Sequence, residues 1–123
     1  MQPILRINNH DYTEYVEELS PSRNDLDAEG SGRDVQSGEM FRIRIASKQK
    51  WDVKMLRLPE AVHRQLCEDI NPQFFPATIL DPETNTPATK IFYVSTVPYG
   101  VQRYDRQRQE TYYDGTSFSM TER

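Results

Sequence analysis

The chain has one cysteine, Cys67, among its 123 residues. A single cysteine cannot close an internal disulfide, which excludes the small disulfide-stapled class of secreted domains and favours folding in a reducing cytoplasm. Long hydrophobic runs are also missing, since no window approaches the ~18 apolar residues of a membrane-spanning helix. The N-terminal "MQPILRINNH" has no extended apolar core of a signal peptide. We therefore expect a soluble protein that carries neither an export signal nor a membrane anchor.

An excess of basic residues is absent as well. Fifteen Lys and Arg residues face nineteen Asp and Glu residues, which gives a net charge of -4. The summed field would repel a phosphate backbone, so nucleic-acid binding is disfavoured. The length is that of one modest hydrophobic core, and we expect a single domain over residues 1–123.

Sequence motifs of catalysis are lacking too: we find no serine nucleophile elbow, no carboxylate pair in an apolar setting and no glycine-rich nucleotide loop. His63 and Cys67 lie four residues apart on a predicted helix, where an imidazole can activate a thiol. The same two side chains are metal ligands, but a structural zinc site needs four ligands and the only other candidate is His10. A small buried cysteine is the favoured interpretation. We predict no enzyme, no cofactor and no metal site.

Alternating apolar residues predict most of the secondary structure. "PILRINNHDYT" is a short strand followed by turn residues, while "YTEYVEEL" fits a helix or a strand. In "MFRIRIASKQKWDVKMLRL" apolar residues alternate on both sides of "SKQK", which predicts a hairpin with its turn there. A second hairpin surrounds "DPETNTP", and the C-terminal third contains a strand near 99–105, a polar link over 106–110 and a final strand through Tyr112, Phe118 and Met120.

One helix is predicted in "LPEAVHRQLCEDI". Leu58, Val62, Leu66 and Ile70 repeat at steps of four residues, which places them on one face of a helix. The helix should end near Asn71, because the residue before a proline avoids the helical region. The predicted fold class is mainly β (α+β): an antiparallel β-sandwich or small barrel with one flanking helix and a long loop.

The long loop is predicted over residues 20–40, "SPSRNDLDAEGSGRDVQSGEM", which holds three of the five glycines. Its acidic residues suggest a calcium loop only in part. Counted from Asp25, Gly30 occupies the sixth place, as in an EF-hand, but Gln36 stands where the twelfth-place glutamate is required. A solvated or interface-forming loop is favoured.

Tyrosines are concentrated near the C-terminus, with four of the seven between Tyr99 and Tyr113. Together with the arginines of "RYDRQRQ" they resemble the cation and aromatic mixture of single-strand binders, but Asp105, Glu110 and Asp114 dilute the charge. Tyrosine is enriched at protein interfaces, and it also half-covers many sheets. We predict a protein contact or a solvated strand face here, at Tyr99, Arg103, Tyr104, Arg106, Tyr112 and Tyr113.

Four stretches, taken in order, carry a likeness to a known family: "RINNHDYTEYV", "SRNDLDAEGSGRDVQSGEMFRIRIASKQKWDV", "FFPATILDPETNTPATKIFYVS" and "YYDGTSFSMTE". Together they span nearly the whole chain, which resembles the small tail-module structural proteins of long-tailed (siphovirus-type) bacteriophages and prophages. The resemblance implies a tail-tube-like fold and a non-enzymatic subunit of a phage tail, distal tail or baseplate. It further implies a virion location after synthesis in the cytoplasm of the host bacterium.

The resemblance also implies partners, namely other tail proteins and copies of the same chain in a homo-oligomeric ring. The long loop would then become ordered against a neighbour. Its charged residues would set the register of that contact: Arg23, Asp25, Asp27, Arg33 and Asp34.

The alternative is a binding module for carbohydrate or peptide. Trp51 and exposed tyrosines would form its platform, and a buried Trp51 would count against it.

Overall fold

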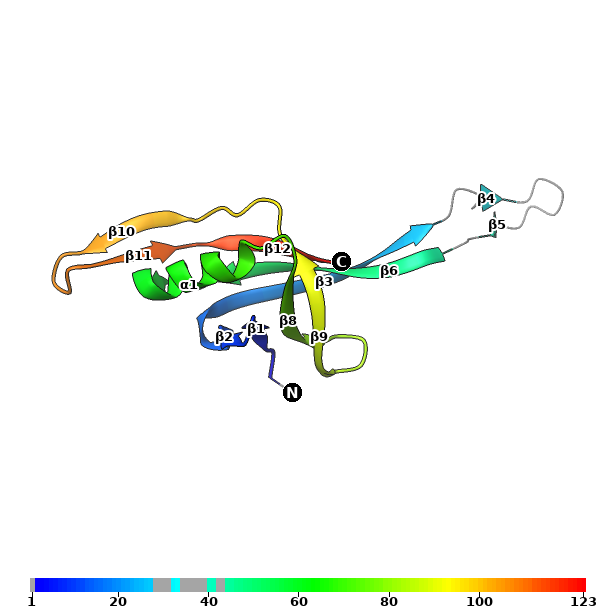
Figure 1. Ribbon diagram of the computed structural model, residues 1–123, viewed down its shortest axis with the longest axis horizontal. Helices are drawn as coiled ribbons and strands as arrows, with labels where there is room; N and C mark the ends of the chain where they lie inside the picture. Colours follow the sequence, from blue (N-terminus) through cyan, green and yellow to red (C-terminus); the bar gives the residue numbers. More distant parts are fainter. Residues whose placement is uncertain (1, 28–31, 34–39, 42–43) are drawn as a thin grey trace.

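The computed structural model describes residues 2–27, 32–33, 40–41 and 44–123, with side chains for 2–23 and 47–123. The fold is mainly antiparallel β with one flanking helix, as predicted (Figure 1). Seven strands form the main sheet in the order β2-β1-β8-β9-β12-β6-β3. Their bounds are β1 Leu5–Ile7, β2 His10–Asp11, β3 Val16–Asp27, β6 Arg44–Met55, β8 Phe75–Asp81, β9 Thr86–Tyr93 and β12 Ser117–Glu122.

Two smaller sheets complete the described structure. The first has the order β10-β11-β7, with β10 Val101–Asp105, β11 Glu110–Asp114 and β7 Leu58–Pro59. The second pairs β4 Gly32–Arg33 with β5 Met40–Phe41. The helix α1 (Glu60–Ile70) packs against β11 and β7, and a single 3₁₀ turn, Thr13–Tyr15, precedes β3. The stretch "YTEYVEEL" therefore contains both a helical turn and the start of a strand.

The predicted short strand and the predicted second hairpin are present. Asn8 and Asn9 both have positive φ, 52° and 70°, as a two-residue turn between β1 and β2 requires. In the β8–β9 hairpin Asp81 faces Thr86, and Asn85 takes the positive φ of the turn. Asparagine tolerates this backbone region better than most residues.

The hairpin predicted around "SKQK" is wrong. Residues 44–55 form one continuous strand, β6, which pairs with β3 on one side and with β12 on the other. Ile45 and Trp51 have the same parity, so the alternation passes through "SKQK" without a change of phase. Gln49 occupies the core-facing position between them and is 5% exposed. Gln49 is thus a polar side chain on the buried face of a continuous strand and not part of a turn.

Three other predictions change in extent. Residues 20–27 of the predicted loop belong to β3, because β6 offers them a pairing partner, and residues 28–31 and 34–39 lie outside the described residues. The final strand is two strands, β11 and β12, in different sheets, with the break at Gly115 and Thr116. The helix begins at Glu60 rather than at Leu58 and ends at Ile70, as predicted.

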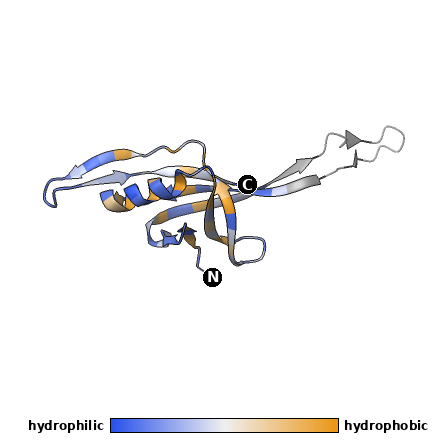
Figure 2. Cartoon of the chain, viewed as in Figure 1, coloured by the Kyte–Doolittle hydropathy of each residue, from blue (hydrophilic) through white to orange (hydrophobic). Residues whose placement is uncertain are grey.

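The core lies between the main sheet and the helix. It is formed by the inward-facing residues of β1, β6, β8, β9 and β12 together with one face of α1 (Figure 2). Its members are Leu5, Ile7, Tyr12, Trp51, Val53, Met55, Leu58, Leu66, Ile70, Phe75, Ala77, Ile79, Phe92, Phe118 and Met120. The β3–β6 ribbon and the β10–β11 hairpin project from this body toward opposite ends (Figure 1).

Candidate functional site

The β3–β6 ribbon, here called the arm, is built from two twelve-residue strands. β12 pairs with β6 only between Lys50 and Lys54, so beyond that point β6 is paired with β3 alone. The two-stranded part, Arg44 to Gln49 of β6, is about 20 Å long at ~3.3 Å per residue. Within it Ser47 is exposed, whereas Gln49 at its base is buried.

The arm contains most of the charged residues that the sequence predicted as contacts. Arg23 is half exposed and forms a 3.4 Å ion pair with Glu83 of the β8–β9 turn. Asp25 and Asp27 lie on β3 opposite Ser47 and Arg44. Arg33 lies on β4 opposite Met40, and Asp34 is outside the described residues.

The β10–β11 hairpin carries the predicted tyrosine and arginine set. Tyr99 and Tyr104 are 56% and 58% exposed, whereas the other two tyrosines are in contact with neighbours. The guanidinium of Arg57 lies 3.5 Å above the ring centre of Tyr112. On the outward face Arg103 pairs with Asp114 at 3.7 Å, and Arg106 lies in the turn. The predicted tyrosines and arginines thus lie on or beside this hairpin, whereas the predicted loop residues are divided between β3, β4 and a position outside the described residues.

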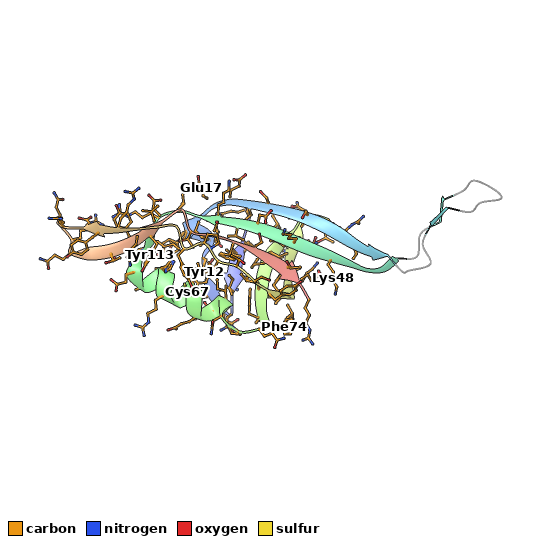
Figure 3. All side chains as sticks on the ribbon, turned by 90° about the horizontal axis from the view of Figure 1, so that it is seen from above. Tyr12, Glu17, Lys48, Cys67, Phe74 and Tyr113 are labelled. Atoms are coloured by element: carbon orange, nitrogen blue, oxygen red, sulfur yellow. The ribbon has the colours of Figure 1, made fainter. Side chains whose placement is uncertain are left out.

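Tyr113 joins this hairpin to α1. Its ring stacks on the imidazole of His63 with centroids 3.8 Å apart, and Tyr99 approaches the same imidazole edge-on at 5.6 Å (Figure 3). His63 is 6% exposed, and its Nε2 has no hydrogen-bond partner among the described residues. Burial lowers the pKa of this imidazole below its usual 6.5. The hairpin therefore rests on the helix through a neutral aromatic contact.

Cys67 does not have the environment of a nucleophile. Its Sγ lies 3.7 Å from His63 Nδ1, but burial raises the pKa of the thiol while it lowers the pKa of the imidazole. An activated cysteine requires the opposite shift, because the thiolate is the reactive form. The pair belongs to the packing between α1 and β11.

The sequence did not reveal a polar cluster around Asp69. This carboxylate on α1 is 4% exposed and accepts hydrogen bonds from the hydroxyl of Tyr12, from His10 Nδ1 at 2.8 Å and from Asn8 Nδ2 at 3.5 Å. Burial, followed by the hydrogen bond to Asp69, raises the pKa of Tyr12. The only available signal was a carboxylate on the buried face of the helix, next to Ile70. The cluster fastens the β1–β2 hairpin to α1.

A second buried network lies at the base of the arm. Trp51 Nε1 donates to Gln49 Oε1 at 3.2 Å, and Gln49 Nε2 donates to Asp81 Oδ1 at 3.2 Å. The backbone N–H of Glu83 and the side chain of Gln49 hold the pKa of Asp81 below its usual value. Trp51 is 3% exposed, so it cannot serve as the platform of a carbohydrate-binding or peptide-binding module.

An apolar groove of about 480 Å³ lies beside the first half of β3 and Trp51 of β6. Its walls come from β3 itself and from the N-terminal segment and the β8–β9 turn across from it. The apolar residues that line it include Leu5, Val16, Leu19, Trp51, Leu80 and Pro82. In the part of the chain that the structure describes, no group of three or more His, Cys, Asp or Glu side chains is placed to hold a metal ion. Nor does this part contain a helix with the length and hydropathy of a membrane span.

Searches against protein-family models and against curated proteins find no match. Two solved structures are similar in fold. A chain in the "Virion of native gene transfer agent (GTA) particle" aligns with a TM-score of 0.61 and 9% identity, over 99% of this chain and 91% of that one. A chain in the "Tail of empty GTA particle computed with helical refinement, C6 symmetry" aligns with a TM-score of 0.53 and 10% identity, over 89% and 78%. At these identities the likeness is one of fold.

Proposed function

We propose that this protein is a non-enzymatic structural subunit of a phage-like tail. The observation that carries the proposal is the fold match over 99% of the chain to a component of a gene transfer agent virion. A second match, to a chain in the tail of such a particle, supports the same class. An enzyme could have used an activated thiol, but Cys67 packs against His63 and burial raises the pKa of its thiol.

The proposed assembly is a ring of copies of this chain that also contacts other tail proteins. The tail of the second match was determined with C6 symmetry. We propose a sixfold ring for this chain as well. The arm and the β10–β11 hairpin point to opposite ends of the molecule (Figure 1), so each can contact a different neighbour. Exposed Tyr99 and Tyr104 supply apolar contact area, and the charged residues of the arm fix the register.

The position we propose is the tube or the distal tail and baseplate of a long-tailed, siphovirus-type phage or prophage. The protein would be made in the cytoplasm of the host bacterium and would reside in the virion. A cytoplasmic origin agrees with its single, partly buried cysteine.

Sedimentation velocity and negative-stain electron microscopy of the purified chain test this proposal. We expect closed rings or short tubes whose abundance rises with protein concentration. A chain that stays monomeric at high concentration, both alone and mixed with the other tail proteins of its particle, would refute the proposal.

A shortened arm tests which part of the molecule assembles. Replacing residues 26–46 by Asn-Gly closes β3 and β6 beyond the Asp25–Ser47 pair and keeps their register. None of the described core residues is removed, so we expect a folded protein that no longer assembles. A companion variant, Asp25→Asn with Asp27→Asn, keeps the length of the arm and separates the effect of charge from that of reach.

A further inference from the structure

Of the strands that end the two larger sheets in the described structure, β3 and β10 are the long ones, with twelve and five residues. β3 ends the seven-stranded sheet and β10 ends the three-stranded sheet, and each pairs on one side only within the described residues. Such an edge presents backbone N–H and C=O groups that can bind another strand. In Figure 1, β10 runs along the upper side of its hairpin whereas the first half of β3 runs below β6. The two edges are different surfaces of the molecule, so pairing one with the other is a head-to-tail contact between copies.

Apolar side chains lie beside both of these edges. The groove along β3 is lined by Val16, Leu19 and Trp51, and its far wall is formed by the N-terminal segment and the β8–β9 turn. At the start of β10, Tyr99 and Val101 are 56% and 52% exposed. Exposed apolar side chains next to a free edge are unfavourable in a monomer. A strand that added to β3 would place alternate side chains over the groove.

The charges beside the two edges are opposite in sign and set the direction of pairing. Glu14 lies in the 3₁₀ turn before β3, and Glu17 lies at the start of β3, where it is exposed (Figure 3). Arg103 lies on β10 and Arg106 follows its end. An antiparallel arrangement brings the acidic start of β3 to the basic end of β10 and leaves the apolar residues together. A parallel arrangement would instead place Val101 beside the glutamates.

We propose that β10 of one copy adds antiparallel to the outer edge of β3 in the next copy, with Val101 opposite Leu19. This register brings Tyr99 to Pro21 and Arg103 near Glu17, which lies at the irregularity of β3 between Val16 and Glu18. A slip of one residue would turn Val101 away from the groove, because side chains alternate between the two faces. Pro21 is tolerated in β3 because an edge strand can lack one N–H donor. The inference rests on the ring assembly proposed above and names the surfaces that would close the ring.

Disulfide trapping tests the register directly. In a Cys67→Ser background, a chain with Leu19→Cys and Val101→Cys is allowed to assemble and is then oxidised. Opposite residues of an antiparallel pair have Cβ atoms ~4.5–5.5 Å apart, close to the disulfide range. We expect a ladder of covalently linked oligomers. The matched control replaces Leu19→Cys by Ser20→Cys, which points to the other face of β3, and should give about tenfold less product.

Charge exchange provides a second measurement. Glu17→Lys and Arg103→Glu should each raise the concentration needed for assembly about fivefold, and the two together should restore it. The Arg103–Asp114 pair within the chain is exposed, so its loss should not unfold the protein. Thermal melts check separately that the variants are folded. Rings that form without the Leu19–Val101 link, or with equal linking in the control, would overturn the edge pairing and leave the tail-subunit proposal standing. Failure of the unsubstituted chain to assemble at all would overturn both.

Discussion

Gly100 and Gly115 flank the C-terminal hairpin and provide a matched pair for testing how it is held. Both have a φ of +82°, a backbone conformation that L side chains rarely adopt. A Cβ added at Gly100 would lie 2.3 Å from the carbonyl oxygen of Asp114 and 2.8 Å from the backbone N of Thr116. A Cβ at Gly115 would meet nothing within 4 Å. The two positions thus share the conformational cost of alanine but differ in steric overlap.

The size of each effect follows from these contacts. Alanine at positive φ costs about 1–2 kcal/mol, which a less flexible unfolded chain offsets by roughly 0.4–1 kcal/mol. Gly115→Ala should therefore lose about 0.5–1 kcal/mol. Gly100→Ala adds an overlap with backbone atoms that no side-chain rotation relieves, worth about 1–3 kcal/mol more. For a chain of 123 residues, 1 kcal/mol corresponds to about 4 °C in Tm.

Differential scanning calorimetry of the two variants is the assay. We expect Tm to fall by about 2–4 °C for Gly115→Ala and by about 6–16 °C for Gly100→Ala. Hydrogen exchange should show the additional loss of protection in β10 and β11. Equal shifts for the two variants, or a larger shift for Gly115→Ala, would refute the close approach between Gly100 and Asp114.

Three further predictions concern the contacts of α1. Tyr12→Phe removes one donor to the buried Asp69 carboxylate and should lower the free energy of unfolding by about 1–3 kcal/mol in urea titrations, and an unchanged midpoint would contradict the buried hydrogen bond. Because burial lowers the pKa of His63, the unfolded chain binds the proton first, so stability should fall as the pH decreases below the usual value of 6.5. His63→Phe keeps the stacked ring and should flatten that decrease. An unchanged pH profile in this variant would show that His63 does not cause the decrease. Because burial raises the pKa of Cys67, iodoacetamide should alkylate the folded chain more slowly than the urea-unfolded chain at the same pH, and a faster folded-state reaction would show an activated thiol.

Local pattern was sufficient for the fold class and for most strands. Extended runs next to turn residues located β8, β9 and β10, and four-residue spacing located α1. It failed at "SKQK" because the decisive contact is distant in sequence. Gln49 is accepted on the buried face only because Asp81, 32 residues away, satisfies its amide. The unbroken parity between Ile45 and Trp51 was a usable sign that one strand runs through.

The candidate site was predictable in composition and not in shape. Low hydrophobicity predicted a loop over residues 20–40, but the pairing of β3 with β6 places residues 20–27 in a strand and joins residues separated by the whole polar stretch. The tyrosines show the same division. Tyr104 is exposed and Tyr113 stacks on His63, although both alternate along a strand in similar polar surroundings. The difference in their exposure comes from the position of α1, which packs against β11.

The base of the arm has a mechanical consequence. β6 passes from the two-stranded ribbon into the main sheet without interruption, and Gln49, Trp51 and Asp81 connect it there to the β8–β9 hairpin. Interstrand hydrogen bonds in antiparallel pairs lie perpendicular to the strands. Tension along the ribbon axis would therefore load those bonds in shear and simultaneously, rather than opening them one after another. A force applied to the arm would be transmitted to the hydrophobic interior as a whole.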